Sequence, residues 1–168
     1  MDRDAAREPH VRADAAALPL GRAAVDTVLC LEVLEYVWNP ASVLAEFGRV
    51  LRPGGLLVLS TPFLHRADAA DDYWRFTEPA LRRLLNEAGF DVDRVLPQGH
   101  ALAVAANVLR YAVSVQRSRI RRALSVLLRP VFALFLRGDA PQSRRHAELG
   151  TFSTGYLVIA HNRGTGRA

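Results

Sequence analysis

Residues 25–61 constrain the fold more than any other part of the chain. They read VDTVLCLEVLEYVWNPASVLAEFGRVLRPGGLLVLST. Residues 25–30 form a short apolar run with β-branched side chains, which is typical of a buried parallel strand. Asn39 can cap a helix whose first position suits Pro40. The apolar residues that then recur at helical spacing are Val43, Leu44, Phe47, Val50 and Leu51.

A second buried strand is expected at residues 56–60. Pro53, Gly54 and Gly55 should end the helix and turn the chain into this strand. Strand, helix and strand over this length make a right-handed βαβ unit, which builds parallel sheets. The sequence therefore predicts an α/β fold.

The composition limits the classes of protein to consider. Of the 168 residues, 50% are hydrophobic and 23% charged, which is typical of a globular domain with a substantial core. The single cysteine, Cys30, excludes a disulfide framework and a cysteine-based zinc site. The polar start MDRDAAREPH lacks the apolar core of a signal peptide, so we expect a cytoplasmic location. All 22 basic residues are arginine, which rules out a lysine nucleophile.

Positive charge is concentrated in residues 98–150. This segment holds 9 arginines and 2 acids, whereas the rest holds 13 arginines and 15 acids. Two apolar helical runs are expected there, at residues 101–115 and 119–136, with Pro130 kinking or splitting the second. Neither contains an uninterrupted apolar run of the ~18–20 residues that a membrane-spanning helix needs. Residues 138–150 read as a polar loop.

The remaining segments complete the pattern of elements. Residues 10–13 are a candidate short strand, and residues 64–72 a polar loop. Thr77 should cap a helix that ends at Gly89. Two further strands are expected at the positions 90–96 and 154–161.

Several motifs together resemble the class I S-adenosylmethionine-dependent methyltransferases, most closely the small-molecule branch called type 11. The matching positions within residues 25–61 are Asp26, Val28, Val33, Leu34, Glu35, Val37, Asn39, Pro40, Glu46 and residues 49–55. The other matches are Asp14-Ala15 with Leu18-Pro19, the DYWRFT segment at 72–77, Gly89-Phe90, and residues 155–160 as the last strand. The resemblance covers about residues 13–96 plus that strand.

The resemblance also shows what is missing. The family begins with a strand, a G-x-G-x-G loop, a helix and a strand ending in an acid, and no such glycine loop lies near the start of this chain. We therefore expect an N-terminally truncated, Rossmann-like doubly wound methyltransferase sheet that lacks its first two strands and has a helical insertion before the last strand. The family's strand order is 3-2-1-4-5-7-6, so residues 25–30 would be left at an exposed edge. We expect residues 1–97 and 151–163 to form the partial methyltransferase domain and residues 98–150 a basic helical lid or insertion.

The resemblance implies a set of cofactor-binding residues for S-adenosylmethionine. Asp14 and the Ala15 backbone N–H would hold the adenine, although Asp14 could instead turn its own loop. Leu31 and Glu32 would lie beside the methionine part, at the carboxyl end of a strand. Asp2 or Asp4 would be the remnant of the ribose-binding acid.

Residues for the acceptor side are also implied. His65 could take a proton from an acceptor hydroxyl. Tyr73, Trp74 and Arg75 could wall the acceptor site, or could form an aromatic plug in which Arg75 pairs with Asp71 or Asp72.

Glu35 and Tyr36 occupy a position where the family often has Glu-His. A Tyr36 phenol would be a poor acid or base near neutral pH, so we expect this short helix only to pack.

These features predict methyl transfer from S-adenosylmethionine to a small-molecule acceptor, sugar- or envelope-related, without a metal. The alternative is a degenerate, non-catalytic methyltransferase-like module that binds a partner or a membrane surface; a dehydrogenase is disfavoured because a glycine-rich fingerprint is absent. Residues 98–150 could form a lid or a peripheral contact with anionic lipid. Nucleic-acid binding is not expected, since the segment lacks interleaved aromatic residues.

Overall fold

A four-stranded sheet forms the centre of the computed structural model, which describes residues 11–67, 69–116 and 118–164. Its strands are β1 (Val25–Leu31), β2 (Leu51–Pro62), β3 (Phe90–Pro97) and β4 (Gly155–Asn162), in the order β1-β2-β4-β3. β1 and β2 are parallel, with Cys30 opposite Leu59 and Leu31 opposite Ser60. This order equals positions 4-5-7-6 of the sheet predicted from the motifs, so the expected order and the edge position of β1 among the described strands are confirmed.

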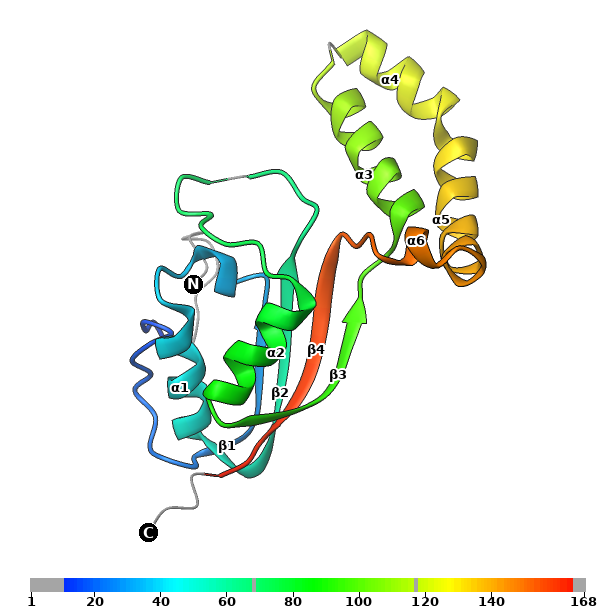
Figure 1. Ribbon diagram of the computed structural model, residues 1–168. Coiled ribbons are helices and arrows are strands. Elements are labelled where there is room, and N and C mark those ends of the chain that lie inside the picture. Colours follow the sequence, from blue (N-terminus) through cyan, green and yellow to red (C-terminus); the bar gives the residue numbers. More distant parts are fainter. Residues whose placement is uncertain (1–10, 68, 117, 165–168) are drawn as a thin grey trace. The chain divides into compact units, whose positions relative to one another are not determined.

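The strand β4 runs against its neighbours (Figure 1). The N–H of Arg163 donates to the Gly89 carbonyl at 3.0 Å, while the N–H of Gln98 donates to the Gly155 carbonyl at 2.8 Å. The end of β4 therefore meets the start of β3. The N–H of Phe63 donates to the Thr154 carbonyl at 2.8 Å, so the start of β4 lies beside the end of β2.

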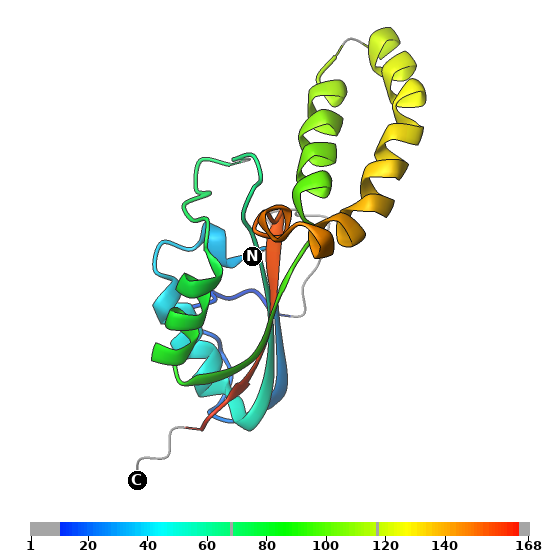
Figure 2. The same ribbon diagram turned by 45° about the vertical axis from the view of Figure 1, so that its right-hand side comes forward.

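Two helices cover one face of this sheet, α1 (Pro40–Val50) and α2 (Glu78–Glu87), as both views show (Figures 1 and 2). Both caps were predicted: Asn39 Oδ1 accepts from the Ser42 N–H at 3.3 Å, and Thr77 Oγ1 from the Ala80 N–H at 3.4 Å. The buried side chains that join helices and sheet include Leu44, Val50, Leu57, Leu59, Leu81, Leu85, Phe90 and Val158. Leu29 and Leu31 of β1 are 66% and 51% exposed, because alternate residues of a strand face opposite ways.

The junction between α1 and β2 differs from the prediction. Pro53, Gly54 and Gly55 lie inside β2 rather than in a turn before it, and the pairing with β1 is irregular between Val25 and Thr27. Gly54 has φ +75°, and a Cβ on Gly55 would lie 2.9 Å from the Arg52 carbonyl oxygen. The register steps from Val25–Leu51 to Thr27–Leu56, so residues 52–55 form a wide bulge opposite Asp26, which local turn chemistry could not reveal.

The described residues fall into two compact units. The first contains those up to Pro62, residues 66–96 and those from Tyr156 onward; the second contains residues 63–65 and 97–155. Short helices complete each: the 3₁₀ helix η1 (Leu34–Tyr36) in the first, and α6 (Ala147–Gly150) in the second.

The second unit is helical, with α3 (Ala101–Ser114), α4 (Ser118–Leu127) and α5 (Arg129–Arg145) before α6. The predicted break near Pro130 is confirmed, since α4 ends at Leu127 and Pro130 is the second residue of α5. The predicted polar loop at 138–150 is wrong, because α5 continues to Arg145 and α6 follows at Ala147–Gly150. Gly138 of α5 faces α3, since a Cβ there would lie at an ordinary contact distance of 3.4 Å from Leu102 Cδ1.

The predicted short strand at 10–13 is also not found. Residues 11–13 carry no strand and residue 10 lies outside the described part. Within the described residues the only pairing nearby is an isolated bridge between Asp14 and Ala17. A strand needs a partner, and none of the described strands lies next to this segment in the sheet.

Candidate functional site

The carboxyl ends of β1 and β2 hold a strained glutamate. Glu32 follows β1 with φ +53°, a conformation that costs energy for a residue with a side chain. Its N–H donates to the Ser60 carbonyl at 3.1 Å, and the Ser60 hydroxyl donates to Glu32 Oε1 at 2.7 Å. Ligands of open α/β sheets bind outside the carboxyl ends of strands, so Glu32 occupies a position suited to a ligand.

Glu35, one turn further on, is almost completely buried. It is 1% exposed, and its Oε2 has no hydrogen-bond partner among the described residues. Burial raises its pKa from 4.5 to about 7, with smaller upward contributions from Glu32 and Asp72; a bond from its own backbone and the charge of Arg75 act in the opposite direction. The sequence interpretation assigned this helix only a packing role and missed this acid. A glutamate among apolar neighbours was the available signal.

Cys30 lies on β1, two residues before Glu32, and its thiol is buried. Burial, with the nearby Glu35 charge, raises its pKa to about 12. A thiol with such a pKa stays protonated at neutral pH and is a weak nucleophile. Cys30 therefore contributes packing rather than covalent chemistry.

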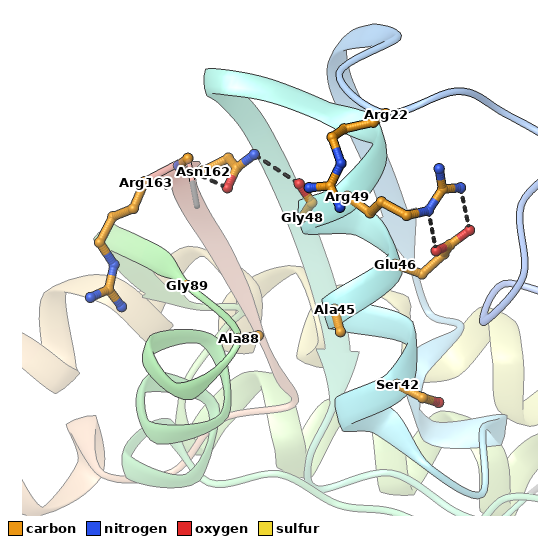
Figure 3. A pocket seen from close by; sticks show the side chains of 11 residues that line it. Arg22, Ser42, Ala45, Glu46, Gly48, Arg49, Ala88, Gly89, Asn162 and Arg163 are labelled. Carbon is orange, nitrogen blue, oxygen red and sulfur yellow. Dashed lines mark hydrogen bonds and ion pairs between the residues drawn. The ribbon is translucent and has the colours of Figure 1, made fainter. Parts of the chain in front are cut away.

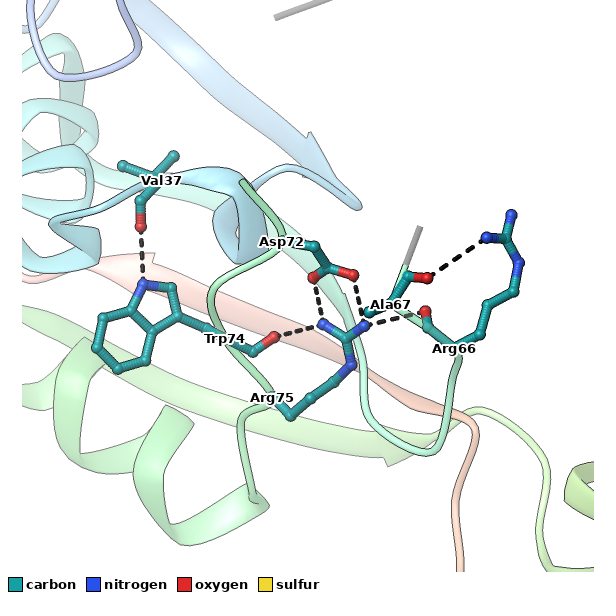
Figure 4. Close-up of polar contacts among 6 residues, drawn as sticks. All are labelled: Val37, Arg66, Ala67, Asp72, Trp74 and Arg75. Atoms are coloured by element: carbon teal, nitrogen blue, oxygen red, sulfur yellow. Dashed lines mark hydrogen bonds and ion pairs between the residues drawn. The ribbon is translucent and has the colours of Figure 1, made fainter. Parts of the chain in front are cut away.

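The DYWRFT segment is attached to η1. The Glu35 carbonyl accepts from the N–H groups of Tyr73 at 2.9 Å and Trp74 at 3.3 Å. The Trp74 indole donates to the Val37 carbonyl at 2.8 Å (Figure 4), and the Tyr73 ring meets Trp38 edge-on at 5.3 Å. Tyr73 and Trp74 remain 46% and 39% exposed, so each ring still presents a surface.

Arg75 forms a two-pronged ion pair with Asp72, whose side chain is 2% exposed. The pair joins Nη1 to Oδ1 and Nη2 to Oδ2, the latter at 2.6 Å. The guanidinium also donates to the carbonyls of Trp74 at 2.8 Å and Arg66 at 3.1 Å (Figure 4). Of the two interpretations left open for Arg75, the structure shows the pairing with Asp72.

The Asp14 loop is turned by Asp14 itself. Its Oδ1 accepts from the Ala16 N–H at 2.9 Å and its carbonyl from the Ala17 N–H at 3.0 Å. This is the loop-turning role that the sequence left as an alternative; the adenine-binding role of Asp14 and Ala15 stays a prediction.

Two of the other predicted residues fall outside the described part of the first unit. Asp2 lies outside the described residues. His65 is exposed and belongs to the second unit, where its N–H donates to the Phe63 carbonyl at 3.0 Å. The first unit thus groups Glu32, Glu35 and the segment at 72–77, without His65.

A separate hollow of about 720 Å³ lies at the far ends of α1, α2 and β4 (Figure 3). Arg22, Glu46, Arg49 and Arg163 line it. Glu46 pairs with Arg49, and Arg163 lies 3.2 Å from Asp91. The sequence pattern did not predict this hollow.

No three His, Cys, Asp or Glu side chains within the described residues could together hold a metal ion. No helix of the described part has the length and apolar content to cross a membrane.

Comparison with known structures identifies the fold. A candidate sarcosine dimethylglycine methyltransferase from Galdieria sulphuraria matches with a TM-score of 0.55 at 13% identity, covering 92% of this chain and 58% of the other. The [4+2]-cyclase SpnF matches with a TM-score of 0.53 at 20% identity, covering 90% and 54%. The fold is therefore that of Rossmann-like methyltransferases, which also hosts a cyclase, so fold alone does not settle the reaction.

Sequence comparison defines the relationship further. Residues 1–59 match the methyltransferase domain family. A protein of Mycolicibacterium smegmatis, named as an S-adenosylmethionine-dependent methyltransferase, is 33% identical over 142 residues, which are 74% of this chain and 55% of the relative. A ubiquinone biosynthesis O-methyltransferase of Thiobacillus denitrificans is 34% identical over 88 residues, covering 42% and 38%. By these matches the chain is similar to the class I S-adenosylmethionine-dependent methyltransferases, as its motifs predicted, and it spans about half the length of the Mycolicibacterium relative.

Proposed function

We propose that this chain takes part in transferring the methyl group of S-adenosylmethionine to a small-molecule acceptor. The observation that carries the proposal is Glu32, held at φ +53° by Ser60 at the carboxyl end of β1. Strain of this kind persists where the surrounding structure enforces it and is concentrated at functional sites. The named relatives supply the reaction class.

The side chains at this site fit the charge of the proposed cofactor. S-adenosylmethionine carries a sulfonium and an ammonium against one carboxylate, a net positive charge. Glu32 supplies a carboxylate at this site, whereas Asp72 is paired with Arg75 and burial raises the pKa of Glu35 to about 7. We propose that Glu32 and the Leu31 backbone hold the methionine part, and that Asp14 and Ala15 hold the adenine. Asp2 is kept as a weaker candidate for the ribose.

When bound, the cofactor supplies an electrophilic methyl carbon, whose bond to sulfur breaks as the acceptor's lone pair forms the new bond. The chain's residues would align the acceptor for this in-line attack, which supplies much of the rate. Tyr73 and Trp74 offer exposed ring faces for an apolar or planar acceptor. An anionic acceptor would have to compete with Asp72 for Arg75, which disfavours it. His65 is proposed as the group that takes the acceptor's proton.

The class of acceptor is proposed as sugar- or envelope-related, or lipid-linked. Relatives from several bacteria are named for ubiquinone biosynthesis. The exposed aromatic rings and the apolar second unit are compatible with a partly apolar acceptor.

Calorimetric titration of the chain with S-adenosylmethionine tests the proposal. We expect saturable binding that Glu32→Gln weakens, because the charge facing the cofactor's cation is lost, while Glu87→Gln on the exposed face of α2 leaves it unchanged. If no heat of binding appears up to millimolar cofactor, the non-catalytic module becomes the better description.

A second proposal concerns the helical unit, which we propose contacts anionic membrane lipid. The observation that favours it is the exposure of Val126, Leu127 and Leu134, at 56%, 69% and 69%. Arg119, Arg121, Arg129 and Arg137 are exposed on the same helices. Apolar side chains flanked by arginines are typical of interfacial helices.

Liposome flotation tests this contact. Vesicles rich in phosphatidylglycerol should carry the chain upward, pure phosphatidylcholine vesicles should not, and Leu127→Ser with Leu134→Ser should reduce flotation severalfold. Equal recovery from both kinds of vesicle, or none from either, would remove the proposal.

A further inference from the structure

Both backbone polar groups of Leu18 are held by one ion pair of α1. Its N–H donates to Glu46 Oε1 at 2.7 Å, and its carbonyl accepts from Arg49 Nη2 at 3.2 Å. Glu46 and Arg49 form a two-pronged pair, with Nε to Oε2 and Nη2 to Oε1 both at 2.7 Å (Figure 3). We call these two side chains the Glu46–Arg49 clasp.

The clasp lies on a helix that is packed into the core. Glu46 and Arg49 lie on the last turns of α1, whose Val43, Leu44, Phe47 and Val50 are buried in the core. The Glu46 side chain is 11% exposed and that of Arg49 31%. The hydrogen bond from Arg49 is the largest cause that lowers the pKa of Glu46, so the carboxylate stays charged through the neutral range.

A backbone hydrogen bond ties the other end of the loop to the same helix. The N–H of Ala23 donates to the Arg49 carbonyl at 2.9 Å, so residues 18 and 23 are both tied to the end of α1. Between the first tie and Asp14 lie only three residues, and these are folded by the Asp14 turn. The position of Asp14 and Ala15 therefore follows from the position of Leu18.

We propose that Glu46 and Arg49 are positioning residues for the cofactor: they hold Leu18 so that Asp14 and Ala15 face the adenine. This rests on the proposed function, because it assumes that the loop binds S-adenosylmethionine. It also gives a physical role to two residues that sequence motifs alone marked only as matches. An isolated surface ion pair contributes little to stability, whereas this one satisfies both the N–H and the carbonyl of Leu18.

The test uses three variants: Glu46→Ala, Arg49→Ala and the double variant that carries both substitutions. The control is Glu87→Ala, which breaks an exposed pair with Arg83 on α2. Hydrogen exchange of the Leu18 amide is measured without cofactor, and the dissociation constant of S-adenosylmethionine by calorimetry. We expect Leu18 exchange to quicken and the dissociation constant to rise, each by about tenfold, as loss of one charged hydrogen bond implies. The double variant should resemble Glu46→Ala, because paired residues act as a unit. Glu87→Ala should change neither quantity.

The outcomes separate the two proposals. Faster Leu18 exchange with an unchanged dissociation constant would overturn the positioning role while leaving methyl transfer intact. Unchanged exchange in both single variants would overturn the clasp itself. A parent chain that binds no cofactor contradicts the proposed function, and the positioning role with it, while the exchange still reports whether the clasp holds the loop.

Discussion

The carboxylate of Asp139 in α5 accepts a hydrogen bond from the backbone N–H of Leu102 in the first turn of α3, at 3.0 Å. The same carboxylate accepts from the N–H groups of His100 at 2.7 Å and Ala103 at 3.1 Å. Asp139 is 7% exposed. A residue of one helix thus supplies the N-terminal cap of another, and the negative charge meets the positive end of the α3 dipole.

Replacing Asp139 should therefore loosen the helical unit. We expect Asp139→Ala to destabilise it by about 2 kcal/mol, because three N–H groups lose a charged acceptor. Urea unfolding followed by circular dichroism measures the loss, and exchange of the Leu102 and Ala103 amides locates it. Asp93→Ala, which removes an acid that is 48% exposed, is the matched control. Equal effects of the two substitutions would contradict the capping role.

Glu35 should make the free energy of unfolding depend on pH. Its folded pKa of about 7 lies above the ordinary 4.5, so the folded state holds this proton more tightly than the unfolded state does. Stability should consequently fall as pH rises from about 4.5 to above 7, by about 3 kcal/mol for this group. Glu35→Gln should flatten that slope in urea titrations at several pH values. A slope that the substitution leaves unchanged would show that another group is responsible.

Removal of Arg75 should be costly because the buried carboxylate of Asp72 would lose its two-pronged ion pair. We expect Arg75→Met to destabilise the first unit by about 3 kcal/mol. Adding Asp72→Asn should restore part of that loss, since the unpaired charge disappears. Arg83→Met, which breaks the exposed pair with Glu87, should cost less than about 0.5 kcal/mol. Urea midpoints of the four chains decide the question, and a double variant less stable than Arg75→Met would contradict it.

A substitution at Gly89 should lower the stability of the fold solely because of the backbone conformation at this position. It ends α2 with φ +89°, and a Cβ there would meet nothing within 4 Å, so crowding is not the issue. We expect Gly89→Ala to cost about 1–2 kcal/mol, as a left-handed residue with a Cβ does. Gly21→Ala is the control, because Gly21 also has open space and no positive φ. Thermal unfolding compares them; an equal midpoint for both variants would argue against backbone strain at Gly89.

Much of the first unit was predictable because its signals are local. The run at 25–30, the Asn39 cap and the apolar spacing of α1 each depend on residues within a few positions of one another, and all three are found. The strand order followed from motif resemblance, and β1-β2-β4-β3 agrees with it. The DYWRFT segment was marked as a motif, but its attachment to η1 through Glu35 and Val37 was not foreseen.

The sequence by itself determined the α/β class, the βαβ unit and the helix caps, because hydrophobic periodicity and capping act over short stretches of chain. Only the tertiary structure decided that residues 138–145 stay helical, that Gly54 and Gly55 form a bulge within β2, and that Glu35 is buried with a raised pKa. It also decided that Glu46 and Arg49 hold the Leu18 peptide. Each of these depends on a partner far away in the chain, and burial and hydrogen bonding between distant residues arise only once the chain has folded.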